Sequence, residues 1–367
     1  MLKRLAVILI AVMSLAVVGA QELEWSVDMN AVFKNSEVER SETPGETNIF
    51  TRITPLIGVS MDSTRHRIMG GVTWYQPMND RMHGYKVVPA LYYQYKNSEK
   101  GLNFKIGMIP NERPSMPIYL CSDSINRMSP NVNGLSIALF KPHFLVSAML
   151  DWRQIMTNKR REAFMVIADI GWRNLHTTNV GDNYIVVAST IAYNHLARSG
   201  ARPEGEGVVD NFITYPRVMY SHWWRNASIA VEAGLLLSCD RDRVAENKWL
   251  TQAGFFGGVI GNWKWLTVAQ NIYAGKQQMP LYEKYGSLLY QGQNFFRDKF
   301  YSRTMVAATF FKTDYLNIQA QLSFHATDKT SAFWQQIAVR FYLDRSLWGK
   351  YKKKERHDYY SPLPPQF

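Results

Sequence analysis

Apolar and polar residues alternate along most of this chain with a period of two. In segment 315–325, every second residue from Leu316 to Phe324 is apolar, and the residues between them are polar. Successive side chains of a strand point to opposite faces, so this pattern predicts a strand with one apolar and one polar face. Amphipathic helical patterns are hard to find. The pattern therefore predicts an all-β protein.

The alternation recurs at intervals that define about sixteen strands, within a range of fourteen to eighteen. Most of these segments reach the ~9–11 residues that a tilted strand needs to cross a bilayer, and an even number suits a closed antiparallel barrel. No run of ~18 apolar residues, the length of a membrane-spanning helix, follows position 20. The predicted strands are 24–34, 49–60, 66–76, 85–96, 102–109, 134–141, 143–152, 163–173, 184–196, 212–222, 227–238, 249–260, 264–275, 300–312, 315–326 and 333–344.

The connections between these strands fall into two alternating sets. The links after every second strand are mostly short, as at 61–65 and 313–314, with 174–183 as the exception. The other set is longer and more polar, as at 110–133 and 276–299. Short periplasmic turns and long external loops are expected of an outer-membrane barrel, whereas a soluble β-sandwich has no reason to sort its loops this way.

Aromatic residues support the same architecture. They make up 13% of the chain, with 11 Trp and 20 Tyr, and they cluster near the predicted strand ends. Two aromatic girdles at the membrane–water interfaces would produce this distribution. Ordinary core aromatics would explain their number but not their location.

The N-terminus has the layout of a secretory signal peptide. Lys3 and Arg4 precede an apolar stretch at 5–18, and small residues end at Ala20. The apolar stretch is shorter than the ~18–20 residues of a membrane anchor, which is the competing interpretation. We therefore expect a signal peptide at 1–20, a transmembrane barrel at 21–345 and a basic, Pro-containing periplasmic tail at 346–367.

The net charge of +12 changes the expected partners rather than the fold. Nucleic-acid binding is a poor explanation for the charge of an exported protein, and basic loops near anionic outer-membrane lipid or lipopolysaccharide explain it better. The basic run at 350–356 is either a solvated tail or a contact for anionic headgroups or a partner.

In length, secretory start, strand number and a long third external loop, the chain resembles bacterial porin-like outer-membrane barrels. The segment 102–110 is similar in its Gly-then-Pro strand end to the phosphate-selective-porin-like group, and the loops resemble those of Bacteroides-type outer-membrane barrels. This resemblance implies a pore in the bacterial outer membrane, often a homotrimer, narrowed by the third loop. The chain departs from the pattern at its end, because Pro-rich residues precede the terminal Phe367.

Face assignment predicts which charged residues point inward, since a lumen charge escapes the ~2–4 kcal/mol cost of facing lipid. Five basic and three acidic side chains indicate either a weakly anion-favouring pore or a set of internal salt bridges that fill a closed barrel. The predicted pore-lining residues are Asp28, Arg52, Lys86, Lys105, Asp169, Arg217, Glu232 and Arg340.

The loop at 110–133 is the predicted constriction. It carries four prolines and an apolar stretch from Ile118 to Cys121 that favours burial, so we expect it to fold into the lumen rather than cap the surface. Cys121 and Cys239 are a possible disulfide pinning this loop, and two separate thiols are the alternative.

Enzymatic motifs and ligand-spaced histidines are missing from the sequence, so we expect no enzyme and no cofactor. Ser323 and His325 share one face of a predicted strand, and Asp151 or Asn317 could complete a hydrolase set, but polar lumen residues produce such pairs by default. The sequence thus favours a channel for passive diffusion of small solutes. The alternative is a non-conducting barrel that serves assembly, adhesion or secretion.

Overall fold

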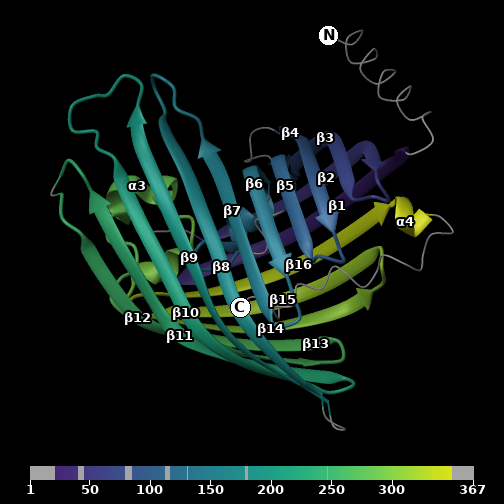
Figure 1. Ribbon diagram of the computed structural model, residues 1–367. Coiled ribbons are helices and arrows are strands. Elements are labelled where there is room, and N and C mark those ends of the chain that lie inside the picture. Colours follow the sequence, from purple (N-terminus) through teal and green to yellow (C-terminus); the bar gives the residue numbers. More distant parts are fainter. Residues whose placement is uncertain are drawn as a thin grey trace.

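The computed structural model describes residues 21–39, 45–78, 85–111, 116–129, 131–177, 181–245 and 247–348. Sixteen antiparallel strands close into a barrel, in which β1 pairs with β2 and with β16 (Figure 1). Every other strand pairs with its neighbours in sequence. The predicted closed antiparallel barrel is confirmed. The predicted signal peptide and all but the first residues of the predicted tail lie outside the described residues.

The strands match the sixteen predicted segments one for one, and most extend further at their ends. Their bounds are β1 Gln21–Glu39, β2 Glu46–Met61, β3 His66–Pro77, β4 Lys86–Asn97, β5 Leu102–Ile109, β6 Val132–Phe140, β7 Phe144–Gln154, β8 Arg161–Thr177, β9 Asp182–Ser199, β10 Val209–Trp223, β11 Ala227–Asp242, β12 Leu250–Trp263, β13 Leu266–Gly275, β14 Phe300–Lys312, β15 Leu316–Thr327 and β16 Ser331–Asp344.

Helices in the described part of the chain are few and short. They are α2 Asp123–Met128, α3 Tyr282–Leu289, the 3₁₀ helix η2 Asn294–Arg297 and α4 Arg345–Trp348. Within the described ranges, no helix has the length and apolar character needed to cross a membrane.

The strands alternate between a buried inner face and an exposed outer face. In β11, Ala230, Glu232 and Leu236 are buried, whereas Val231 and Leu235 between them are exposed. Exposed apolar side chains recur in this way around the barrel. An apolar exterior around a partly polar interior is the inverse of a soluble sandwich and suits a lipid surround.

The two ends of the barrel differ in the length of their connections. One end carries short turns, such as 98–101 between β4 and β5, where Gly101 has φ +64° and a Cβ would lie 1.8 Å from the carbonyl oxygen of Phe140. The predicted long exception at 174–183 is wrong, because β8 ends at Thr177 and β9 begins at Asp182, which leaves only four residues between the two strands. The other end carries the longest connections, 110–131 and 276–299.

Candidate functional site

Two long connections turn inward and pack against the inner wall of the barrel. We name them loop L3 (110–131, between β5 and β6) and loop L7 (276–299, between β13 and β14). Side chains of both loops belong to one buried cluster with inward residues of strands β7–β14. The prediction that L3 folds into the lumen is therefore confirmed.

The apolar stretch of L3 supplies the centre of this cluster. Ile118, Tyr119, Leu120 and Cys121 are all buried. The ring of Tyr119 meets three aromatic rings nearly edge-on, with centroids 5.4–6.5 Å away; they belong to Tyr215, Phe256 and Phe296. Edge-to-face contacts at this spacing are favourable beyond the area they bury.

Loop L7 was predicted only as a longer, more polar connection of the external set, and its burial was not predicted. Its helix α3 buries Tyr285 and Leu289, and η2 buries Phe296. The helix is kinked at Gly286, whose φ of +51° and ψ of −142° suit glycine. The missed signal was the aromatic content of 282–296, which a solvated loop has no reason to carry.

Backbone hydrogen bonds join the two loops. The N–H of Ser122 donates to the carbonyl of Gln291 at 2.7 Å, and the N–H of Gln293 donates to the carbonyl of Ile118 at 2.9 Å. At Gly292 a Cβ would lie 2.2 Å from the carbonyl oxygen of Tyr119, so this close approach requires glycine. The loops therefore form one body, which we call the plug (116–129 and 276–299).

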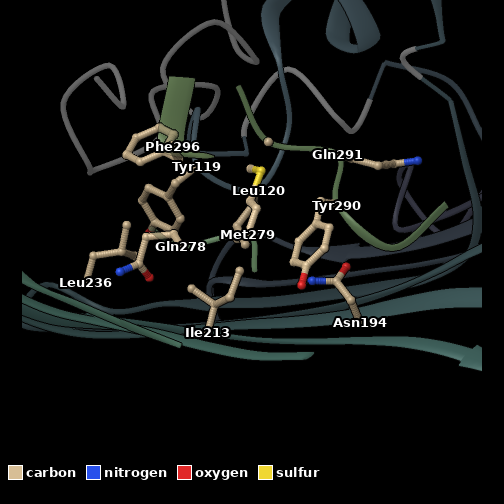
Figure 2. Close-up of a pocket in the computed structure, with 11 residues that line it drawn as sticks. Tyr119, Leu120, Asn194, Ile213, Leu236, Gln278, Met279, Tyr290, Gln291 and Phe296 are labelled. Atoms are coloured by element: carbon tan, nitrogen blue, oxygen red, sulfur yellow. The ribbon is translucent and has the colours of Figure 1, made fainter. Parts of the chain in front are cut away.

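The seat of the plug on the wall is tightly packed. Figure 2 shows Tyr119, Met279 and Phe296 of the plug above Ile213 and Leu236 of the wall. The space left between them holds about one water molecule. Burial of each large apolar side chain stabilises by ~1.5–3 kcal/mol, so lifting five of them would cost on the order of 10 kcal/mol. The plug is a fixed part of the fold.

Carboxylates at the rim of the barrel hold L7. Asp242, the last residue of β11, accepts hydrogen bonds from Lys284 Nζ at 2.8 Å and from the hydroxyl of Tyr285. This bond raises the pKa of the Lys284 ammonium. Asp240 lies two residues earlier on the same inner face of β11, and it accepts a hydrogen bond from the hydroxyl of Tyr290 at 2.5 Å. Each of these two carboxylates binds α3 or its end directly.

A second set of polar contacts holds L3 on the β14–β1 side. Arg303 of β14 donates to Asp123 of α2 at 3.1 Å. Lys34 of β1 donates to Ser124 at 3.3 Å and lies 3.6 Å from the ring centroid of Trp334. L3 is therefore fixed at both of its sides, by apolar packing and by an ion pair.

Three of the predicted inward charges meet at the start of L3. Asp28 accepts from Arg340 at 2.7 Å, from Asn111 at 3.1 Å and from Asn30 at 2.7 Å. Arg52 donates to the side-chain oxygen of Asn111 at 3.1 Å. This network ties β1, β2 and β16 to L3.

Three others meet under the plug. Arg217 lies 3.7 Å from Glu232, and both side chains are buried. Thr190 donates to Asp169 and accepts from Arg217 at 2.8 Å. The alternative of internal salt bridges therefore describes this group well.

The last two predicted residues stand apart from both groups. Lys105 is half-buried opposite Gln94 of β4, and Lys86 is exposed at the first residue of β4. All eight predicted residues occupy inner-face positions, but whether they line a conducting path stays a prediction.

The possible disulfide is not formed. Cys121 and Cys239 both lie in the described part of the chain and are not bonded to each other. The cause is strand alternation: Ser238 and Asp240 are buried on the inner face of β11, so Cys239 between them points outward. Cys121 is buried inside the plug, on the other side of the barrel wall.

The lumen does not assemble the hydrolase set considered from the sequence. Nδ1 of His325 lies 2.9 Å from the hydroxyl of Tyr301, and Ser323 accepts from Gln321 at 2.9 Å. Asp151 belongs to β7, which does not adjoin β15. Among the described residues, no group of three or more His, Cys, Asp or Glu could hold a metal ion.

A polar cluster missed from the sequence lies on the outer face near the long-loop end of β9 and β10. Nδ1 of His195 lies 3.0 Å from Asp210 and 2.8 Å from the hydroxyl of Tyr193. Arg243 donates to both oxygens of Asp210, at 2.7 and 3.1 Å. Rings surround the cluster, and Phe212 stacks on Tyr193 with centroids 4.4 Å apart. Asp210 is thereby a buried carboxylate on a lipid-facing side.

The closed barrel, its apolar exterior and its loop pattern define a porin-like protein of the bacterial outer membrane. An anion-selective porin from Comamonas acidovorans has the same fold, at a TM-score of 0.51 and 8% identity over 88% of this chain and 99% of that chain. OccK1 (OpdK) from Pseudomonas aeruginosa has a TM-score of 0.46 and 9% identity, again over 88% of this chain and 99% of that chain. OprD from Pseudomonas aeruginosa has a TM-score of 0.46 and 7% identity, over 88% of this chain and 96% of that chain.

Family membership is more specific than these structural likenesses. The model of the lipid A 3'-O-deacylase-type family matches residues 15–350, and the chain belongs to this family. No curated protein matches the chain.

Proposed function

We propose that this protein is an outer-membrane channel for passive diffusion of small polar solutes, narrowed by the plug to one side of the lumen. The observation that carries the proposal is the asymmetry of the interior. The plug packs against β7–β14, whereas the inner faces of β15, β16, β1 and β2 are mostly polar. Solutes would pass along this second surface, the polar wall.

The charge of the polar wall supports a weak anion preference. The Arg340 side chain is 55% exposed, whereas its partner Asp28 is 7% exposed. The predicted basic residue Arg52 adds positive charge to this wall, and Lys105 adds it on the inner face of β5. Rings and patches of charge set ion selectivity in such pores.

A planar-bilayer recording of the purified full chain tests the channel directly. Stepwise conductance with a modest chloride-over-potassium preference is the expected result. Silence from protein that shows the heat-modifiable gel mobility of a folded barrel would contradict it and favour the non-conducting alternative, a barrel for assembly, adhesion or secretion. Crosslinking in the native membrane would test the homotrimer that the porin resemblance implies.

A second candidate function is hydrolysis of a lipid ester in the outer leaflet. Two observations favour it: the family membership and the outward His195–Asp210 pair. With Asp210 holding Nδ1, Nε2 of His195 would take a proton from water as that water attacks the ester carbonyl. The alkoxide leaving group would then be protonated, which yields a carboxylic acid and an alcohol. Arg243 and nearby lipopolysaccharide phosphates are complementary in charge.

Mass spectrometry of lipid A from cells that express the chain or a His195→Gln variant tests this candidate. Loss of the 3'-linked acyl chain only with the unsubstituted protein would support hydrolysis. Identical lipid A in both strains and in cells without the protein would contradict it. A Ser323→Ala variant is the matched control, since the lumen pair should have no role.

A further inference from the structure

The short turns at one end of the barrel differ in charge from one side of the barrel to the other. Three of them join neighbouring strands within β6–β13, and each carries a basic residue without an acidic one: Lys141, Arg225 and Lys264. Three short turns elsewhere each carry an acidic residue: Asp62, Glu99 and Asp314. Positive charge is therefore concentrated at the short-turn end of β6–β13, which we call the basic arc.

The three basic side chains of these turns lack a counter-charge. All three are exposed, and none forms an ion pair with another residue in the described part of the chain. The contrast is Arg65 in the turn between β2 and β3, which lies 3.6 Å from Asp62 and 3.7 Å from Glu99. An exposed cation without a carboxylate nearby keeps its charge for a partner outside the chain.

A fourth cation joins the basic arc at the turn between β6 and β7. Arg173 of β8 donates from Nε and Nη2 to the carbonyl oxygen of Pro142, at 3.2 and 3.1 Å. Its backbone N–H donates to the carbonyl oxygen of His143 at 2.8 Å. Arg173 is thereby held at the turn that contains Lys141. Among the described residues at this end of β6–β13, the only acidic one is Asp182, the first residue of β9.

Exposed tryptophan rings indicate the depth of these charges in the membrane. Five Trp side chains at the turns and strand ends of the basic arc are 39–54% exposed: Trp172, Trp223, Trp224, Trp263 and Trp265. Nζ of Lys264 lies 5.2 Å from the ring centroid of Trp263. Tryptophan rings lie at the level of the lipid headgroups, and long basic side chains extend to the same level. The cations of the arc therefore lie at headgroup depth.

We propose that the basic arc binds phospholipids with negatively charged headgroups. The short turns of an outer-membrane barrel face the periplasm, so the arc meets the leaflet that consists of phospholipid. Basic residues at a bilayer surface attract anionic lipids over about a Debye length. The acidic residues in the other turns cancel this attraction, so the anionic lipids gather on one side of the barrel. This inference goes beyond the channel and hydrolysis proposals and depends on neither.

The test places the full chain in nanodiscs that contain equal amounts of phosphatidylglycerol and phosphatidylcholine. Native mass spectrometry then counts the lipids of each kind that stay bound, and we expect phosphatidylglycerol to exceed phosphatidylcholine. One variant combines three substitutions in the basic arc: Lys141→Gln, Arg225→Gln and Lys264→Gln. Its ratio of the two lipids should fall by at least about fivefold, which is the effect of roughly one basic residue at an anionic surface.

The matched control variant combines Arg65→Gln, Lys100→Gln and Lys312→Gln. It loses the same charge from turns and strand ends that have an acidic residue within three positions, so its ratio should change by less than about twofold. Higher salt should lower the preference of the unsubstituted protein, because salt screens exposed charges.

Three results would overturn the proposal. If the unsubstituted protein shows no preference for phosphatidylglycerol, the arc does not bind anionic lipid, and an acidic protein would fit it instead. An unchanged ratio in the arc variant removes the role of these residues. Equal losses in the arc and control variants show an effect of net charge without a site. Heat-modifiable gel mobility of every variant ensures that each result comes from a folded barrel, and none of these results depends on conductance.

Discussion

The inner wall of β7–β14 and the polar wall of β15, β16, β1 and β2 obey the same alternation but face different neighbours. The first wall directs apolar residues such as Tyr215, Leu236 and Phe256 inward, and the plug covers them. The second directs amides and the Asp28–Arg340 pair inward, with Arg340 half exposed. The comparison shows that an inward apolar residue in a wide barrel requires a partner, and here two loops provide it. Variants that affect one wall and not the other can test this division.

The largest effect is expected from the plug. Phe296→Ala removes a fully buried ring between Tyr119 and Tyr301 and should cost about 3–5 kcal/mol of unfolding free energy. Denaturant unfolding in lipid vesicles measures it. Phe310→Ala is the matched control, since that ring is 69% exposed on the outer face and should lose much less. Equal losses would show that the plug contributes no more than the exterior.

A smaller loss is expected at the rim. Tyr290→Phe removes a buried hydrogen bond to the carboxylate of Asp240. The free energy of unfolding should fall by about 1.5–3 kcal/mol, because the buried carboxylate loses one of its donors. The same substitution at Tyr220, whose hydroxyl bonds Asn183 on the exposed outer face, should cost well under that. Denaturant unfolding of the two variants measures the difference between their losses of unfolding free energy. A larger loss at Tyr220 would contradict the assignment of L7 as a fixed element.

On the polar wall the expected effect is on selectivity. Asp28→Asn removes the negative partner of Arg340, so the chloride-to-potassium permeability ratio should rise, roughly fourfold for one charge about 5 Å from the path. Reversal potentials in a salt gradient measure this ratio. If Asp28→Asn left the ratio unchanged, the pair would not lie on the path.

The smallest effect is expected from alkaline pH. The hydrogen bond from Lys284 to Asp242 raises the pKa of the ammonium in the folded chain. Because this pKa is raised, the charged ammonium stabilises the folded chain fully at pH values below 10.5, the pKa of the unfolded chain. The contribution disappears as the pH rises through the pKa of the folded chain. Stability should therefore fall above about pH 10.5, and by less in Lys284→Gln, as thermal unfolding would show. Because Lys284 is half exposed, the difference will be modest.

Much of the fold could be predicted because alternation and loop length are local signals. Segment 315–325 forms β15 as expected, and the inner-face positions of Asp28 and Arg340 follow from counting by two. Burial of 118–121 was also predictable, because an apolar stretch inside a long loop needs a partner.

The pairing of distant side chains could not be predicted in the same way. Loop length placed L7 among the external loops, and only the rings at Tyr285, Tyr290 and Phe296 hinted at its burial. The pairing of Cys121 with Cys239 was considered from the sequence, but the outward direction of Cys239 on β11 excludes the disulfide. His195 and Asp210 meet only because β9 and β10 pair in register, and spacing along the chain does not reveal this.

The backbone link between Ser122 and Gln291 has a consequence for folding order. It joins segments from the first third and the last quarter of the chain, and the Arg303–Asp123 pair spans 180 residues in sequence. Contacts this distant form late, since the intervening chain must be placed first. L3 therefore has no finished binding surface until β13 and β14 are available. A barrel arrested before that point would expose Tyr119 and its apolar neighbours, which would mark an incomplete molecule for quality control.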